Sequence, residues 1–110
     1  MNFDEKLNKA DINISTSGDN TIISAPGAGK YLAIDYIDLL PTSAVTVQFK
    51  SGATAYGGPY PFDAKQATTK ENAMQNQDGV LTMADNASFV INLSAAIQVG
   101  GLVRYRIING

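Results

Sequence analysis

The chain has 110 residues, a net charge of −2, only 16% charged residues, and neither His nor Cys. This length allows a single domain. The lack of Cys excludes disulfides and thiolate metal sites, and without His and Cys the commonest general base and nucleophile of enzymes are missing. Its eight basic residues form no cluster, so we expect no nucleic-acid partner and no attraction to a membrane. No apolar run is long enough to span a bilayer or to act as a signal peptide, which predicts synthesis in the cytoplasm.

Residues 1–11 differ in composition from the remainder because they are dense in charge. Their apolar side chains, Phe3, Leu7 and Ala10, have helical spacing, but a segment this short is marginal as an isolated helix. We expect an extended N-terminal arm that either frays or docks on a neighbouring subunit through Phe3 and Leu7. The arm precedes one domain formed by residues 12–110.

After the arm, apolar residues recur at every second position, which indicates β-strands. The predicted strands are residues 11–15, 21–25, 31–40, 45–50, 80–83, 88–94 and 102–108. Clusters of Gly, Pro, Asn and Ser separate them and indicate turns. Short strands spaced about ten residues apart predict an all-β fold, either a sandwich or a barrel.

The last predicted strand, residues 102–108, has the clearest assignment of faces. Alternation places Val103, Tyr105 and Ile107 toward the core, and it places Arg104 and Arg106 toward solvent.

Two segments leave alternatives open. Residues 52–63 contain Tyr56, Tyr60 and Phe62 among Gly and Pro, which suggests a loop that either packs over its own rings or uses them to contact a protein or a sugar. Residues 63–77 are rich in Ala, Lys and Gln, yet lack the apolar stripe of an amphipathic helix. We favour a short extended segment near residues 66–70 followed by a loop.

The motifs that could carry chemistry are incomplete. Residues 25–31 resemble half of a phosphate-binding loop, but Ser24 and Tyr31 occupy the positions of its first Gly and its Ser or Thr, so we expect a hairpin turn there. Asp35 and Asp38 are three residues apart on a strand and point to opposite faces. The loop aspartates lack calcium-binding spacing. We therefore expect a non-enzymatic protein with no catalytic residue, cofactor or metal.

A resemblance rests on the order of several short motifs. An Asn-Thr-Ile-Ile-Ser-Ala-Pro-Gly-Ala-Gly-Lys-Tyr-Leu segment starts at residue 20, and Lys-Ser-Gly follows the valine-rich strand. Asp-Gly, Asn-Leu-Ser-Ala, Val-Gly-Gly and Tyr then follow at residues 78, 92, 99 and 105. This order resembles small virion proteins of tailed bacteriophages, chiefly of the capsid decoration (cement) type. The charged segment 63–77 departs from their pattern.

The resemblance implies a single jelly-roll-like β-sandwich on the exterior of a phage capsid. It implies the major capsid protein as partner and a homo-oligomer, commonly a trimer, that stabilises the shell through protein contacts. The alternative is a tail or fibre component, with Tyr56, Tyr60 and Phe62 as stacking platforms for a carbohydrate. In both cases the chain is made in the bacterial cytoplasm and acts as part of the virion.

Overall fold

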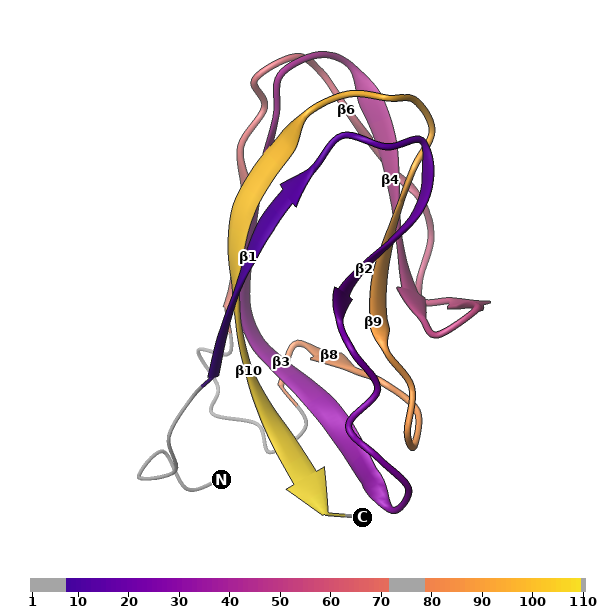
Figure 1. Cartoon of the computed structure of the whole chain (residues 1–110). Coiled ribbons are helices and arrows are strands. Elements are labelled where there is room, and N and C mark those ends of the chain that lie inside the picture. The colour runs from indigo at the N-terminus through magenta and orange to yellow at the C-terminus, as the bar shows by residue number, and fades with distance from the viewer. Residues whose placement is uncertain (1–7, 72–78, 110) are drawn as a thin grey trace.

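The computed structural model describes residues 8–71 and 79–109, and every regular element in these two ranges is a β-strand (Figure 1). The strands are β1 (Asn8–Ile14), β2 (Gly18–Ile23), β3 (Lys30–Pro41), β4 (Val45–Ser51), β5 (Thr54–Ala55), β6 (Tyr60–Phe62), β7 (Thr68–Glu71), β8 (Leu81–Thr82), β9 (Phe89–Leu93) and β10 (Val99–Asn109). The predicted all-β class is confirmed, since neither described range contains a helix.

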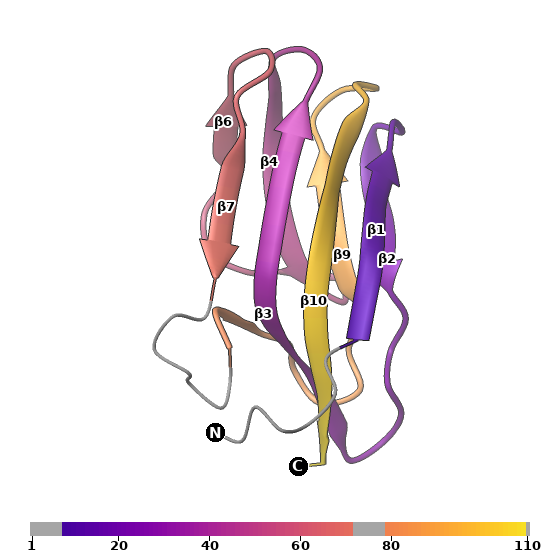
Figure 2. The same ribbon diagram turned by 90° about the vertical axis from the view of Figure 1, so that its left-hand side faces the viewer.

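The strands form two antiparallel sheets in a sandwich-like arrangement (Figures 1 and 2). Sheet A has the order β1-β10-β3-β7, and β8 also pairs with β3. Sheet B has the order β2-β9-β4-β5, and β6 also pairs with β4. The two late strands β9 and β10 therefore lie between strands from the first half of the chain.

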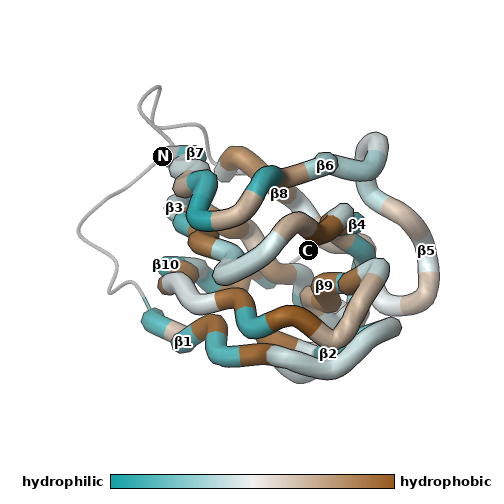
Figure 3. Tube along the Cα trace, turned by 90° about the horizontal axis from the view of Figure 1, so that it is seen from above, coloured by the Kyte–Doolittle hydropathy of each residue, from teal (hydrophilic) through white to brown (hydrophobic). Residues whose placement is uncertain are grey.

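The core lies between the two sheets, where the apolar alternate positions of each sheet meet. Viewed from above, the two sheets lie side by side and both carry strongly hydrophobic positions (Figure 3). The buried cluster includes Phe49 and Phe89, whose ring centroids are 5.9 Å apart, together with Ile34 and Ile91. Each fully buried side chain of this size contributes about 1.5–3 kcal/mol relative to an exposed one.

The N-terminal boundary differs from the prediction, because β1 already starts at Asn8. Residues 8–11 of the expected arm pair with β10, so they are part of sheet A. Phe3 and Leu7 lie outside the described residues. The strand signal in residues 8–11 was weak because Lys9 and Asp11 lie on the outer face of an edge strand and resemble a charged arm.

The predicted hairpin at residues 25–31 is wrong, although a turn is present. Strand β2 pairs with β9 and strand β3 pairs with β10, so this link crosses from sheet B to sheet A. The amide N–H of Gly27 donates to Oδ1 of Asn86 (2.9 Å), and the N–H of Asn86 donates to the carbonyl of Lys30 (2.7 Å). Contacts with a distant loop, not with a partner strand, therefore stabilise the link.

A β-bulge in β3 breaks the simple alternation of this strand. Arg104 pairs with Tyr36 and Tyr105 pairs with Ile34, so Asp35 is an extra residue in β3. One extra residue reverses the side to which the following side chains point. The core-facing residues accordingly change from odd to even positions across the bulge: Leu39 and Ile37 on one side, Ile34 and Leu32 on the other.

The prediction for residues 102–108 is correct in part. Val103 is buried, Tyr105 packs against the core and Arg104 is exposed, as expected. Contrary to the prediction, Arg106 is only 4% exposed and pairs with the buried Asp35, and Ile107 is 46% exposed. Within the described residues β1 pairs with β10 only as far as Tyr105, so the end of β10 lacks that neighbour.

The ambiguous segments form short edge strands. Residues 52–63 contain β5 and β6, both paired with β4. Strand β7 agrees with the extended segment predicted near residues 66–70 and pairs with the edge of β3. The loop expected after it lies mostly outside the described residues.

Candidate interaction surfaces

The aromatic side chains of residues 52–63 pack inward. The Tyr60 ring lies 5.4 Å from that of Phe49 and 6.4 Å from that of Phe62, the latter pair nearly parallel at 18°. Phe62 is only 6% exposed and belongs to the core. Tyr56 is partly buried, and its hydroxyl oxygen accepts a hydrogen bond from the N–H of Thr82 (3.2 Å). The segment therefore packs over its own rings, the first of the interpretations given above.

Tyr60 also connects the two sheets at this rim of the sandwich. Its ring belongs to β6 of sheet B, and Nζ of Lys70, on β7 of sheet A, lies 5.1 Å from the ring centroid. A cation at this distance is attracted to the negative face of the ring. One face of the Tyr60 ring is thus used within the chain, which leaves less of it for a sugar or a partner protein.

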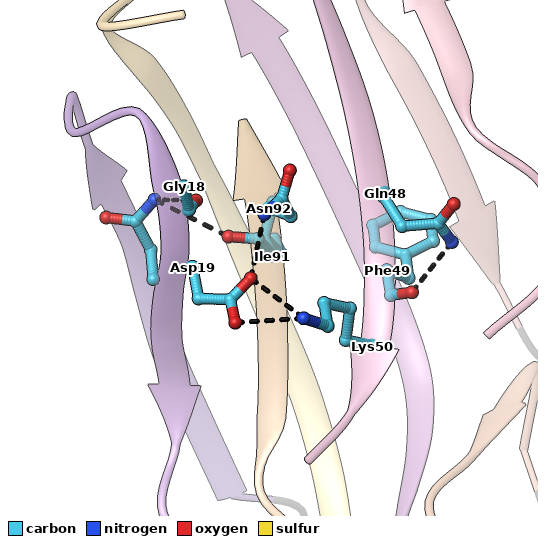
Figure 4. Close-up of polar contacts among 8 residues, drawn as sticks. Gly18, Asp19, Gln48, Phe49, Lys50, Ile91 and Asn92 are labelled. Atoms are coloured by element: carbon cyan, nitrogen blue, oxygen red, sulfur yellow. Dashed lines mark hydrogen bonds and ion pairs between the residues drawn. The ribbon is translucent and has the colours of Figure 1, made fainter. Parts of the chain in front are cut away.

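A polar cluster lies on the outer face of sheet B and joins three strands (Figure 4). Asp19 on β2 accepts hydrogen bonds at Oδ1 from Nδ2 of Asn92 (2.8 Å) on β9 and from Nζ of Lys50 (3.1 Å) on β4. Nζ of Lys50 also donates to Oδ2 (2.9 Å). The hydrogen bond from Asn92 and that from Lys50 lower the pKa of Asp19 below the ordinary value of 3.8, because both favour the charged form.

The contacts of this cluster hold neighbouring strands together, and the lowered pKa of Asp19 does not suit a general base. A carboxylate with a lowered pKa is a poor general base, since an effective base has a pKa near the working pH. Beside the cluster, Nε2 of Gln48 donates to the carbonyl oxygens of Phe49 (2.9 Å), Tyr56 (3.2 Å) and Gly57 (3.1 Å). The polar side chains of this face thus form hydrogen bonds with one another and with backbone carbonyl groups of β4 and of residues 56–57.

A buried ion pair joins the bulge of β3 to β10. Nε of Arg106 donates to Oδ2 of Asp35 (2.6 Å), and Nη2 donates to Oδ1 (2.9 Å). Asp35 and Arg106 are 5% and 4% exposed. This pair was not predicted from the sequence. The available signal was an aspartate within the long apolar strand 31–40 and an arginine in the last strand, but the spacing of neither residue identifies the other.

An exposed leucine lies on the outer face of sheet A. Leu40 is 46% exposed and pairs in register with Gly100, which has no side chain to cover it. Leu102, two residues further along β10, is partly buried on the same face. Nearby, the Tyr36 hydroxyl donates to Oδ2 of Asp38 (2.7 Å). We call Leu40 and Leu102 the apolar spot of sheet A.

The described residues contain no group of three or more His, Cys, Asp or Glu side chains that could share a metal ion. In the same ranges there is no helix long and apolar enough to cross a bilayer. At the turn that resembles a phosphate loop, the following element is strand β3 and not a helix, so the amide array that binds phosphate in such loops does not form.

In comparisons with known proteins, no family, no curated protein and no solved structure matches this chain. The interpretation of the surfaces therefore depends on the residues themselves and on the order of the strands.

Proposed function

We propose that this chain is a structural protein of a tailed-bacteriophage particle, which binds the outer surface of the capsid and stabilises it through protein–protein contacts. The observation that best supports this role is the strand order, taken with the motif order described above. The partner in this proposal is the major capsid protein, and no chemical step is involved.

The proposal includes a finer description of the fold, the jelly roll. In the path β1-β10-β3-β7 of sheet A and the path β2-β9-β4-β6 of sheet B, strands that end by residue 51 alternate with strands that begin at residue 60 or later. Successive strands β1 and β2, and likewise β3 and β4, lie in opposite sheets. Two interleaved Greek keys of eight strands produce this arrangement in jelly rolls, which are common in viral capsid proteins and lectins. Here β5 with β6, and β7 with β8, each occupy the place of one strand.

The apolar spot of sheet A is the surface that we assign to the capsid. Charged side chains lie on the outer faces of both sheets, Lys50 and Asp19 on sheet B and Lys9 and Asp11 on sheet A, so charge does not distinguish the two faces. Leu40 exposes an apolar side chain beside Gly100, whereas no large hydrophobic side chain among the described residues of sheet B is exposed. Burial of an exposed leucine contributes about 1.5–3 kcal/mol when it is complete.

Binding to undecorated capsids of the encoding phage tests the proposal. We expect the purified protein to bind saturably, and Leu40→Glu to weaken binding at least tenfold because a buried charge replaces an apolar contact. Thr54→Glu is the matched control, since Thr54 is exposed on the far edge of sheet B. Absence of saturable binding by the unaltered protein would contradict the proposal, and equal losses in both variants would contradict the assignment to sheet A.

The expected arm is best tested by removing residues 1–7 alone. Deletion of residues 1–11 would also remove half of β1, so a loss of binding would then report a damaged sheet. The shorter deletion leaves the described strand intact. Weaker capsid binding with an unchanged unfolding temperature is the result that the arm hypothesis requires.

The alternative, a carbohydrate-binding tail or fibre component, has less support. Lectins also use jelly rolls, but stacking on a sugar needs an open ring face. Phe62 is buried, and Tyr60 is already in contact with Phe49, Phe62 and Lys70. Glycan binding that Tyr60→Ala abolishes would favour this alternative over the decoration role.

A further inference from the structure

The edges of the two sheets differ in how open they are to another strand. Strands β5 and β6 have two and three residues, and β6 contains Pro61; β7 and β8 have four and two residues. Strand β2 has a bulge between Thr21 and Ile23. Short strands, prolines and bulges are the devices that keep an edge from pairing with another chain.

Strand β1 has none of these devices. Its seven residues, Asn8–Ile14, pair with β10 without a bulge and contain neither Pro nor Gly. Among the described strands it has a partner on one side only, and it lies at the rim of sheet A (Figure 2). Its other side is therefore a regular row of backbone donors and acceptors.

The side chains of β1 are self-complementary in one particular register. Lys9 and Asp11 lie on the outer face with 62% and 76% of their side chains exposed, and within one chain they are only loosely paired, at 3.9 Å. If a second β1 pairs antiparallel about a two-fold axis at Ala10, Lys9 lies opposite Asp11 of the second copy. By symmetry, Asp11 lies opposite Lys9 of the second copy.

Neighbouring registers are less favourable. A slip of two residues either way places Lys9 opposite Lys9 or Asp11 opposite Asp11, and like charges directly opposite each other are destabilising. A slip of one residue places the core side of one copy against the solvent side of the other. The charges that protect an edge from random pairing thus permit one specific pairing.

We propose that two copies of this chain associate through β1, antiparallel and about a two-fold axis at Ala10, so that sheet A continues across both copies. The inference does not depend on the proposed function. One strand pair is a small contact, so the association is weak and depends on concentration and salt. In an assembly that holds many copies side by side, a weak contact of this kind gains strength from multivalency.

Sedimentation equilibrium of the purified protein tests the pairing with charge reversals. We expect a monomer–dimer equilibrium for the unaltered chain. Lys9→Asp and Asp11→Lys should each raise the dissociation constant about tenfold, because each turns two attractive cross-strand pairs into repulsive ones. The double variant Lys9→Asp/Asp11→Lys should restore the original affinity.

A mixture of the two single variants gives the most specific readout. The Lys9→Asp chain carries two acids and the Asp11→Lys chain two bases, so only the mixed pair is complementary. The mixture should therefore dimerise more tightly than either variant alone. Both positions are exposed, so unfolding temperatures should stay unchanged; these temperatures are the control for folding.

A disulfide reports the position of the axis independently. The chain has no cysteine, so Ala10→Cys introduces a single thiol, and the proposed axis places it opposite its own copy at a distance that a disulfide can bridge. Asn13→Cys on the same strand is the control, since position 13 of one copy does not lie opposite position 13 of the other.

Three results would overturn the proposal. They are an unaltered chain that remains monomeric or forms a trimer, single charge reversals that do not change the dissociation constant, and equal cross-linking at positions 10 and 13.

Discussion

Asp35 and Arg106 carry opposite charges at positions that are 5% and 4% exposed, and two hydrogen bonds fix their geometry. A fork of two donors that matches a carboxylate is specific to arginine, because the lysine ammonium is a single point charge. Removal of one partner leaves the other charged and buried, which costs far more than the intact pair contributes.

We therefore expect Asp35→Ala to lower the free energy of unfolding by about 3–5 kcal/mol, the range typical of a broken buried ion pair. Arg106→Ala should have an effect of similar size. Denaturation with urea, followed by circular dichroism, measures both variants.

Arg104→Ala is the matched control, because Arg104 is exposed on the same strand and should change stability by less than about 0.5 kcal/mol. The double variant Asp35→Leu/Arg106→Met should recover most of the loss, since both buried charges are then replaced by apolar side chains. Equal effects at positions 104 and 106 would contradict the structural role of the pair.

The burial of Arg106 shows what alternation can and cannot predict for a residue. The spacing of β10 correctly placed Arg104 and Arg106 on one face of the strand. It could not separate them, because the burial of Arg106 depends on Asp35, which lies 71 residues earlier in the sequence. The same limit applies to Phe62, whose burial follows from its contacts with the core and not from the Gly- and Pro-rich composition around it.

At the scale of elements, β3 and β10 approach each other closely where Gly101 stands. A Cβ atom on Gly101 would lie 1.9 Å from the carbonyl oxygen of Asp38 and 2.9 Å from its carbonyl carbon. Both atoms belong to the backbone of the neighbouring strand, so neither can move aside without displacing β3. Gly101 thus permits the central strand pair of sheet A.

Gly101→Ala should accordingly destabilise the fold by roughly 1–3 kcal/mol, the usual cost of forcing extra atoms into packed structure. Gly100→Ala is the control, because the nearest atom to its added Cβ is the carbonyl oxygen of Ile12, at 4.0 Å. Thermal unfolding of both variants measures the difference. If alanine is tolerated equally well at the two positions, the close approach of β3 and β10 is not required.

Most strands could be predicted from the sequence because apolar residues alternate with polar ones, or form a continuous run, within each of them. The strand predicted over residues 45–50 differs from β4 by one residue at its end, and β9 lies within the predicted segment 88–94. The bulge at Asp35 could not be predicted, since residues 31–40 are apolar on both faces and show no break in period. The pairing of β2 with β9 was equally hidden, because turn residues at 26–29 suit a hairpin and a link between sheets alike.

At the scale of the whole molecule, Asp19 makes stability depend on pH. Its carboxylate joins β2, β9 and β4, and its pKa is lowered in the folded state by Asn92 and then Lys50. A carboxylate whose pKa is lowered on folding stabilises the protein fully above its unfolded-state pKa, near 3.8. This contribution is lost as the pH falls from that value through the folded-state pKa.

The unfolding temperatures of the unaltered chain and of Asp19→Asn should therefore differ at neutral pH and converge as the solution is acidified below pH 3.8. Added salt should reduce the difference at neutral pH, because the pair with Lys50 is partly exposed. A difference that stays constant across the acid range would show that the charge of Asp19 does not stabilise the fold.

For the whole molecule, the fold class could be predicted from the sequence, but the order of the strands in the two sheets could not. Alternation with frequent turns predicted an all-β fold, which the described residues confirm. The order of strands depends on contacts between residues far apart in the sequence, such as Asn8 with Tyr105, and no local pattern records them. The sequence also did not show that β1 is an edge strand of sheet A, because this depends on its pairing with β10, about 90 residues later.

The position of β10 also has a consequence for synthesis on the ribosome. This strand lies between β1 and β3 and is made after every other described strand, so β1 and β3 lack their shared neighbour until it has been synthesised. Strand β9 stands in the same relation to β2 and β4. The nascent chain therefore exposes apolar strand faces until β9 and β10 have been made, and a product truncated before residue 99 cannot assemble the centre of sheet A. Assembly of the two sheets therefore requires β9 and β10, which are made after all the other described strands.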